Sequence, residues 1–490
     1  MPTLEELERV ARGAPPAPLT GEDRARIGAA RAVVDDALAS GDAIYGVTTG
    51  IGNLASVRIG ADDAAALQLN LVRSHAVGAG QPLAHDVVRA MLALLAASLR
   101  RGHSGVRAEV VELLLGMLEG DVVPVVPSKG SVGSSGDLAP LAHIALVLVG
   151  EGSAVVGGER VDGAAALARA GLKPVTLEPK EGLALINGTH LMAAAGALAV
   201  RDARRLFDAA VVALALSLEA FKGSTVPFDA RLASVRPHPG HERVAARLRE
   251  LLAGSDVVAS HADCGRVQDP YTLRCAPQVL GAMDDALAYI EAALERELLA
   301  VTDNPLVFAD DGDVVAGGNF HGQPLSLPLD HLALVLCELA SFSERRAYAL
   351  LSPSYADLPP FLSPRPGLSS GLMITQYAAA ALVNECQVLA HPAGAGSIPT
   401  SAGQEDFNSM GAAAALKARQ VVENCAQVIA TELVCACQGL EFHRPLRTTA
   451  ALEAAVAKVR AIVPRVEDDR VLSGELAALA GALQTGEVVL

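Results

Sequence analysis

Alanine and leucine recur at helical spacing along most of the chain, and this pattern predicts a mainly α-helical protein. The segments with this spacing are residues 62–119, 136–151, 190–221, 276–301, 328–351, 371–391 and 410–438. Residues 328–351 are apolar on nearly every face until Glu344, which is typical of a helix surrounded by others in a bundle. Strand signals are sparse, and only Gly152 to Val161 has the Val and Gly pattern of a small hairpin.

Short segments rich in Gly, Pro and Asn separate the helices, and loops held by a rigid scaffold are where chemistry usually resides. They are residues 45–53, 124–136, 187–189, 268–270, 303–305, 317–320 and 392–407. We expect a loop-rich N-terminal region, residues 1–190, and a core of long helices with C-terminal helices, residues 191–490. The sequence has no fixed-period repeat.

Composition adds an expectation about assembly. Hydrophobic residues make up 51% of the 490 residues and charged residues only 19%, which leaves little polar material to coat a monomer. Burial between subunits is therefore expected.

A membrane span requires about 18 uninterrupted apolar residues, and the best stretch, Leu191 to Leu218, is interrupted by five charged residues. The start of the chain is acidic and lacks an apolar signal core, so we expect a cytoplasmic protein without membrane contact.

Charge and cysteine usage exclude two other classes. The formal net charge of -16 opposes binding to nucleic acid, whose phosphates require clustered Lys and Arg. Seven cysteines form an odd count without any CxxC pair, so we expect free thiols and no metal site.

The segment from Gly130 to His143, GSVGSSGDLAPLAH, carries the chemistry. Glycines surround two serines and are followed by Asp137 and an apolar helix. On its own this pattern is typical of a helix N-terminus with Asp137 as a first-turn carboxylate. A phosphate loop is disfavoured, because the Walker spacing and its Lys-Ser/Thr ending are missing.

With this segment, the chain resembles the aromatic amino-acid ammonia-lyases and aminomutases, whose members carry an Ala-Ser-Gly triplet followed by Asp-Leu-Ala-Pro-Leu. Seven further blocks occur in family order, so the resemblance covers nearly the whole chain. They are YGVTTGIGNLASVRI from Tyr45, SHAVGAG from Ser74, EGLALINGT from Glu181, VQDPYTLRC from Val267, VTDNPLVF from Val301, GGNFHG from Gly317 and TSAGQEDFNSM from Thr400.

The resemblance implies that the chain makes its own electrophile, 4-methylidene-imidazol-5-one (MIO), from Ser134, Ser135 and Gly136, without a metal or a dissociable cofactor. The Gly136 nitrogen would attack the Ser134 carbonyl, and Ser135 would become the exocyclic methylene. Closing a five-membered ring on the backbone demands a conformation that side chains obstruct, which is why the third residue is glycine. Ring closure uses only the carbonyl of the first residue, so Ser134 in place of Ala is expected to be tolerated. Several helix N-termini aimed at the ring would stabilise negative charge there.

The same resemblance assigns roles to other residues, each with a structural alternative. Tyr45 would be the base for the β-proton, or a packing aromatic. Tyr271 would help the amine to depart, and Arg274, one helical neighbour away if that stretch is helical, would bind the substrate carboxylate in a two-pronged contact. The predicted catalytic residues are Tyr45, Ser134, Ser135, Gly136, Tyr271 and Glu405, and the predicted substrate-binding residues are His75, Asn187, Gln268, Arg274, Phe320 and Phe407. Asn187 and Gln268 could instead cap loops, and Phe320 could be core packing.

The substrate is indicated by His75 and Glu405, which match the pattern of the lyases that act on histidine. An imidazole can satisfy both side chains, whereas a phenyl ring would leave each without a partner at a cost of roughly 1–3 kcal/mol. Phe407 stands where histidine lyases usually have a second His, and Asn408 matches the phenylalanine enzymes, so tyrosine or phenylalanine remains an alternative.

L-histidine giving trans-urocanate is the leading hypothesis. Two alternatives stay open: an aminomutase and a catalytically inactive helical scaffold. The resemblance also implies a homotetramer whose active sites combine loops of three subunits.

Overall fold

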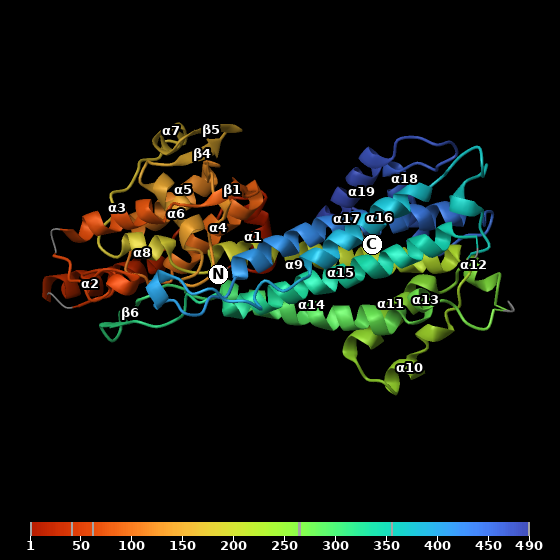
Figure 1. Ribbon diagram of the computed structural model, residues 1–490, viewed down its shortest axis with the longest axis horizontal. Helices are drawn as coiled ribbons and strands as arrows, with labels where there is room; N and C mark the ends of the chain where they lie inside the picture. Colours follow the sequence, from red (N-terminus) through yellow and green to blue (C-terminus); the bar gives the residue numbers. More distant parts are fainter. Residues whose placement is uncertain (1, 41–42, 61–62, 263–265, 354–355, 489–490) are drawn as a thin grey trace. The chain divides into compact units, whose positions relative to one another are not determined.

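The computed structural model describes residues 2–40, 43–60, 63–262, 266–353 and 356–488. Within these ranges the chain forms nineteen α-helices and seven short strands, which confirms the mainly α-helical prediction (Figure 1). Two compact units result. Unit 1 comprises Met1–Leu198, Glu291–Asp330 and Pro392–Leu416, and unit 2 comprises Ala199–Ile290, His331–His391 and Lys417–Leu490. The first segment of unit 1 therefore ends near the expected boundary at 190, but two later segments return to the same unit.

Unit 1 consists of short helices with three small antiparallel sheets. Its elements are α1 Leu4–Ala11, α2 Gly21–Ser40, α3 Ala64–His75, β1 Ala79–Pro82, α4 His85–Leu99, α5 Ala108–Glu119, β2 Val123–Pro124, β3 Pro127–Lys129, α6 Leu138–Leu148, β4 Ser153–Val156, β5 Glu159–Asp162, α7 Gly163–Arg169, α8 Glu181–Ile186, β6 Leu306–Phe308 and β7 Asp313–Val315, with 3-10 turns at Gly52–Leu54 and Ser401–Gly403. Helix α4 packs against α1 and α5, and α6 packs against α3 and α8. The sheets pair β1 with β3, β2 with β4 and β5, and β6 with β7, and the β4–β5 pair is the hairpin expected from Gly152 to Val161.

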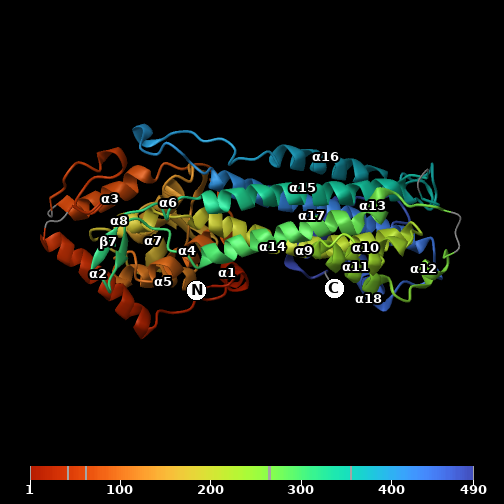
Figure 2. The same cartoon turned by 90° about the horizontal axis from the view of Figure 1, so that it is seen from below.

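Unit 2 is built on long helices that run side by side in both views (Figure 1, Figure 2). The four longest are α9 His190–Ala220, α14 Ala276–Leu298, α15 Gln323–Leu351 and α17 Gly411–Glu441, and the first or last turns of each belong to unit 1. The others are α10 Ala230–Ser234, α11 Pro239–Leu252, α12 Asp256–Ala259, α13 Tyr271–Arg274, α16 Met373–Leu389, α18 Ala450–Ile462 and α19 Ser473–Thr485, with 3-10 turns at Val226–Phe228 and Pro360–Leu362. Apolar spacing thus predicted the four longest helices.

The predicted and observed helices differ in several places, and three of these differences have a clear cause in the sequence. Residues 62–119 form three helices, because the Gly-rich run after His75 becomes strand β1 and a glycine turn separates α4 from α5. Helix α15 begins five residues before 328: Pro324 lies in its first turn, where it costs no helical hydrogen bond, and the helix also continues through Pro328. Helix α2 was missed, because its polar residues are spread around the helix and leave no clear apolar stripe.

One described helix, α15, is long and apolar enough to cross a membrane by length and composition, and it is not the stretch Leu191 to Leu218 that the sequence suggested. Because 67% of its most apolar window is buried inside the protein, it reads as a core helix. Six cysteines are free thiols, and Cys264 lies outside the described residues. No group of three or more His, Cys, Asp or Glu among the described residues could hold a metal ion.

Candidate active site

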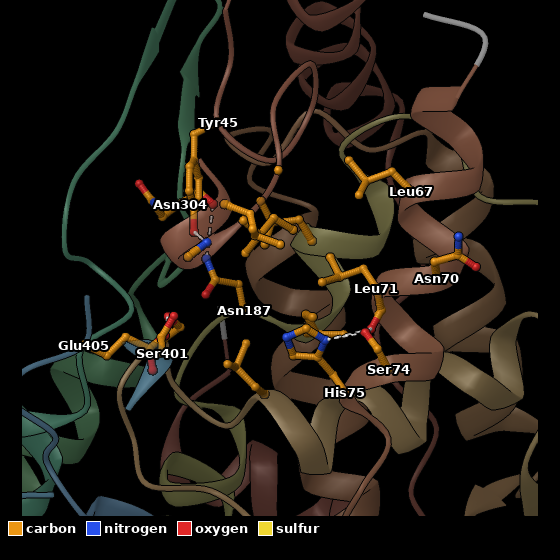
Figure 3. A pocket seen from close by; sticks show the side chains of 18 of the residues that line it. Tyr45, Leu67, Asn70, Leu71, Ser74, His75, Asn187, Asn304, Ser401 and Glu405 are labelled. Atoms are coloured by element: carbon orange, nitrogen blue, oxygen red, sulfur yellow. Dashed lines mark hydrogen bonds between the residues drawn. The ribbon is translucent and has the colours of Figure 1, made fainter. Parts of the chain in front are cut away.

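A cavity of about 620 Å³ in unit 1 brings together six of the twelve predicted site residues. They are Tyr45, His75, Ser135, Asn187, Phe320 and Glu405. In the close view, Tyr45, Asn187 and Glu405 lie on one side of the cavity, and His75 with Ser74 lies on the other, at the end of α3 (Figure 3). Ser134 and Gly136 are buried beside Ser135. Residues from five separate stretches of chain therefore meet at the serine that the ring chemistry needs.

The loop that carries the triplet is held by backbone hydrogen bonds. Gly136 has a φ of 79° and forms a parallel bridge with Gly188. A side chain at Gly136 would place its Cβ 2.0 Å from the Gly188 oxygen, so only glycine fits. Both the left-handed conformation and the close approach exclude a side chain at this position.

Four helices begin around this loop. Helix α6 follows it directly, and α9 begins two residues after the bridge partner of Gly136. Gly322, just before α15, donates its N–H to the Gly133 oxygen at 3.4 Å, and Met410, just before α17, donates to the Val132 oxygen at 2.9 Å. Each helix start carries a partial positive charge, so the loop lies in a field that favours negative charge.

Asp137 is bound differently from the prediction. It was expected in the first turn of its own helix, but its Oδ2 accepts the N–H groups of Leu191 at 2.9 Å and Met192 at 3.0 Å, in the first turn of α9. Its Oδ1 accepts the Ser131 hydroxyl at 2.8 Å. The bridge between residues 136 and 188 brings the start of α9 beside Asp137, whose carboxylate satisfies otherwise unpaired donors there. Complete burial raises the pKa of Asp137 to about 6, against the lowering effect of these hydrogen bonds.

Tyr45 has a phenol oxygen that accepts the N–H of Gly52 at 2.9 Å. Burial raises the pKa of Tyr45, the Gly52 N–H lowers it, and the charge of Glu405 raises it further. A backbone donor at the phenol oxygen stabilises the phenolate, which is the form that accepts a proton. The geometry suits a base, while the nearby carboxylate opposes its ionisation.

Glu405 joins the triplet to the loop 400–405. Its Oε1 accepts the Ser135 hydroxyl at 3.3 Å, and its Oε2 accepts the Thr400 hydroxyl at 2.5 Å. Backbone hydrogen bonds between Thr400 and Glu405 close the loop into a tight turn. The carboxylate is therefore fixed beside Ser135 and keeps lone pairs for a ligand.

His75 presents one defined nitrogen to the cavity. Its Nδ1 lies 2.8 Å from the Leu71 carbonyl oxygen, one helical turn earlier. Because a carbonyl only accepts, Nδ1 carries the proton in this contact, and Nε2 of the neutral ring is an acceptor. His75 can thus receive an N–H from a ligand.

Asn187 is buried at the end of α8, and its side-chain amide donates to Asp303 Oδ1 at 3.3 Å and to the Asn304 carbonyl at 3.2 Å. These bonds leave its carbonyl oxygen as the group that a ligand can meet. Behind it, Lys180 pairs with Asp303 at 2.6 Å, with both side chains almost fully buried. The amide is therefore held in one orientation.

Phe320 lines the cavity, whereas Phe407 does not. The Phe407 ring is 59% exposed and stacks on His321, with ring centroids 6.2 Å apart. Asn408 is buried and donates to the Ile398 carbonyl and the Thr400 hydroxyl, so it braces the loop that carries Glu405. The two residues that departed from the histidine pattern are thus absent from the cavity lining.

Gln268, Tyr271 and Arg274 belong to unit 2 and are not among the lining residues. Tyr271 to Arg274 is a single helical turn, and the Arg274 guanidinium lies 4.5 Å from the centre of the Tyr271 ring. Tyr271 is 68% exposed, and the buried Nε of Arg274 lacks a hydrogen-bond partner among the described residues.

Sequence reasoning left four polar residues of the cavity wall out of the predicted site: Asn70, Ser74, Asn304 and Ser401. Asn304 and Ser401 lie in blocks that had been noticed without a role. Asn70 lies four residues before Ser74, so projecting α3 onto a helix would have placed it on the face of that serine.

His190, directly behind Gly188, should make the protein sensitive to acid. Complete burial lowers the pKa of His190 to about 4. Its stabilising effect is therefore full above pH 6.5 and lost as the pH falls towards 4, by about 3 kcal/mol. We expect the difference in thermal midpoint between the wild type and His190→Gln to shrink from pH 8 to pH 5. The same change at the exposed His391 is the control, and an unchanged difference for His190→Gln would contradict the prediction.

Comparisons with known proteins agree with this geometry. The structure superposes on the histidine ammonia-lyase from Trypanosoma cruzi with a TM-score of 0.92 and 43% identity, covering 99% of this chain and 92% of that one. It also superposes on the tyrosine aminomutase from Streptomyces globisporus with a TM-score of 0.94 and 35% identity, covering 99% and 96%. The histidine ammonia-lyase of Sorangium cellulosum (strain So ce56) is 51% identical over 99% of this chain and 96% of its own length.

Residues 3–461 match the aromatic amino acid lyase family. The chain belongs to this family, as its sequence motifs predicted.

Proposed function

We propose that this protein eliminates ammonia from L-histidine to give trans-urocanate. The observation that carries the proposal is the cavity in which Ser135 lies with Tyr45, His75 and Glu405. The relative at 51% identity is a histidine ammonia-lyase, which supports the same substrate.

The residues of the loop fit the MIO group. Gly136 has the left-handed conformation and no room for a side chain, and the Ser135 hydroxyl faces Glu405. Ser134, Ser135 and Gly136 would form the ring, which supplies an electrophilic carbon for the substrate amine. The four helix starts around the loop favour the negative charge that develops there.

Tyr45 then takes the β-proton of the bound substrate at its phenol oxygen. The Gly52 N–H stabilises the phenolate, and burial keeps water from competing for the proton. Asn187, with its amide fixed by Asp303 and Asn304, orients the substrate through its carbonyl oxygen. Phe320 packs against the bound ring.

His75 and Glu405 select the substrate ring. The Nε2 of His75 and the Glu405 carboxylate are both acceptors, so the N–H of a substrate imidazole can bind either one, and the cavity favours a ring that carries a donor. A phenyl ring offers none.

His75→Leu is accordingly expected to lower kcat/KM for histidine by about 10- to 100-fold relative to phenylalanine, because the imidazole N–H loses its acceptor. Competition assays with both amino acids measure this ratio. His85→Leu, outside the cavity, is the control. An unchanged ratio for His75→Leu would remove His75 from substrate recognition.

Gln268, Tyr271 and Arg274 are proposed to reach the cavity of a neighbouring subunit in a homotetramer. The exposure of Tyr271 and the unpartnered Nε of Arg274 support a partner for this surface. There the guanidinium would hold the substrate carboxylate and Tyr271 would help ammonia to leave. Mixed assemblies of Tyr45→Phe and Tyr271→Phe chains should then recover activity that neither variant has alone, and no recovery would reject shared sites.

We also propose that the protein is located in the cytoplasm, because the six described cysteines are all free thiols.

The test of the function is a panel of histidine, tyrosine and phenylalanine on one preparation, followed by the near-ultraviolet absorbance of the conjugated product. A rise with histidine is expected, and a rise only with tyrosine or phenylalanine would replace the substrate but keep the reaction class. Similarity to a tyrosine aminomutase makes migration of the amine the second candidate, and chromatography for a β-amino acid separates the two. An intact mass without loss of two waters would favour an inactive scaffold.

A further inference from the structure

The triplet lies against the backbone of one residue, Gly188. The Gly188 N–H donates to the Ser135 carbonyl oxygen at 3.2 Å, and the Gly188 oxygen accepts the Asp137 N–H at 2.7 Å. These two bonds flank Gly136 and fix the peptide group between Ser135 and Gly136. The nitrogen of this peptide group, that of Gly136, is the atom that would attack the Ser134 carbonyl carbon.

That nitrogen is itself unengaged. Among the described residues no acceptor binds the Gly136 N–H. The hydrogen bond at the Ser135 oxygen also draws electrons out of the same amide, which makes the Gly136 N–H more acidic. The nitrogen is therefore held in place and can release its proton without first breaking another contact.

Gly188 cannot carry a side chain. Its φ is 111°, and an added Cβ would lie 2.5 Å from Thr302 Oγ1 and 2.8 Å from His190 Cε1. With any larger residue at this position, the backbone must shift away from Thr302, and this shift changes its distance to the triplet.

A second segment fixes Gly188 from behind. Residues 302–304 meet residues 187–189 through three hydrogen bonds: Thr189 N–H donates to Thr302 Oγ1 at 3.3 Å, and the Asn187 amide donates to Asp303 and Asn304. The Lys180 ion pair holds Asp303 in turn. The sequence block 301–308 thus contains the segment that holds residues 187–189, a role that the sequence alone did not indicate.

We propose that Gly188, held by Thr302 to Asn304, is the positioning residue for ring closure, an inference that rests on the proposed function. The Gly136 nitrogen bonds to the Ser134 carbonyl carbon. The Ser134 oxygen leaves as water with the amide protons of Gly136 and Ser135, and Ser135 loses its α-proton and hydroxyl as a second water. Gly188 takes no part in these bonds and acts by holding the attacking amide.

The test is intact-mass measurement of the full chain at intervals after synthesis. In Gly188→Ala we expect the loss of two waters to be about 10- to 30-fold slower than in the wild type, because the bonds to Ser135 and Asp137, on the two sides of Gly136, are displaced. Gly105→Ala is a matched control, since Gly105 also has a positive φ, of 66°, and its Cβ would lie 2.4 Å from Val34. The control should cyclise at the wild-type rate.

Three outcomes are distinguishable. A wild type that keeps its full mass defeats the proposed function before Gly188 is tested. A folded Gly188→Ala that cyclises like the control overturns the positioning role. If circular dichroism shows that Gly188→Ala does not fold, Thr302→Val decides: cyclisation about fivefold slower supports the proposal, and the wild-type rate overturns it.

Discussion

Ser135→Ala is expected to lower kcat for histidine on the order of 10³- to 10⁵-fold, or about 4–7 kcal/mol in the activation free energy. Alanine has no hydroxyl to leave as water, so the exocyclic methylene cannot form and the poor amine leaving group stays unactivated. The intact mass should then lack the loss of two waters.

The fold should survive this change. Before cyclisation the Ser135 hydroxyl makes one long hydrogen bond, to Glu405 at 3.3 Å, so removing it from the uncyclised chain costs only about 0.5–1 kcal/mol. Thermal unfolding should therefore be almost unchanged.

Ser134→Ala is the matched control. Ring closure uses the Ser134 carbonyl and not its side chain, so this variant should lose two waters and keep activity within a few-fold of the wild type. Near-normal activity in Ser135→Ala would contradict the electrophile and, with it, the assignment of the triplet.

Tyr45→Phe is expected to reduce kcat/KM by about 10²- to 10⁴-fold, the usual contribution of a positioned base. The ring should still form, because Tyr45 bonds to Gly52 and not to the triplet. Intact mass therefore separates loss of the base from loss of the electrophile. Tyr377→Phe, an exposed tyrosine of α16, is the control, and equal activity in both variants would exclude Tyr45 as the base.

The pH profile gives the same role a second readout. A base must be deprotonated, so kcat/KM should rise with pH through the pKa of Tyr45, which burial and the Glu405 charge hold above its usual value. Glu405→Gln removes a negative charge that opposes the phenolate. The acid limb of its residual activity should consequently move to lower pH, and a limb that stays in place would show that Tyr45 does not set it.

Much of the site was predictable because its residue types are tied to chemistry. Ser135 and Gly136 were predicted from the chemistry of the proposed ring. The resemblance to the family predicted Tyr45, His75, Asn187 and Glu405, and these four residues line one cavity with Ser135. The tertiary structure added Asn304 and Ser401, whose backbone positions in separate loops decide what they face. It also moved Phe407 onto His321, away from the lining, because side-chain direction in a loop has no period that a sequence can show.

The sequence by itself determined the longest helices and the triplet from Ser134 to Gly136. Apolar spacing is a local property of a helix, and the atoms proposed to form the ring all come from three consecutive residues. Only the tertiary structure decided which helix Asp137 caps and which residue holds the triplet. Both depend on a contact between segments far apart in the chain, such as Gly136 with Gly188, and the geometry of such a contact is set by packing rather than by the neighbouring residues in the sequence.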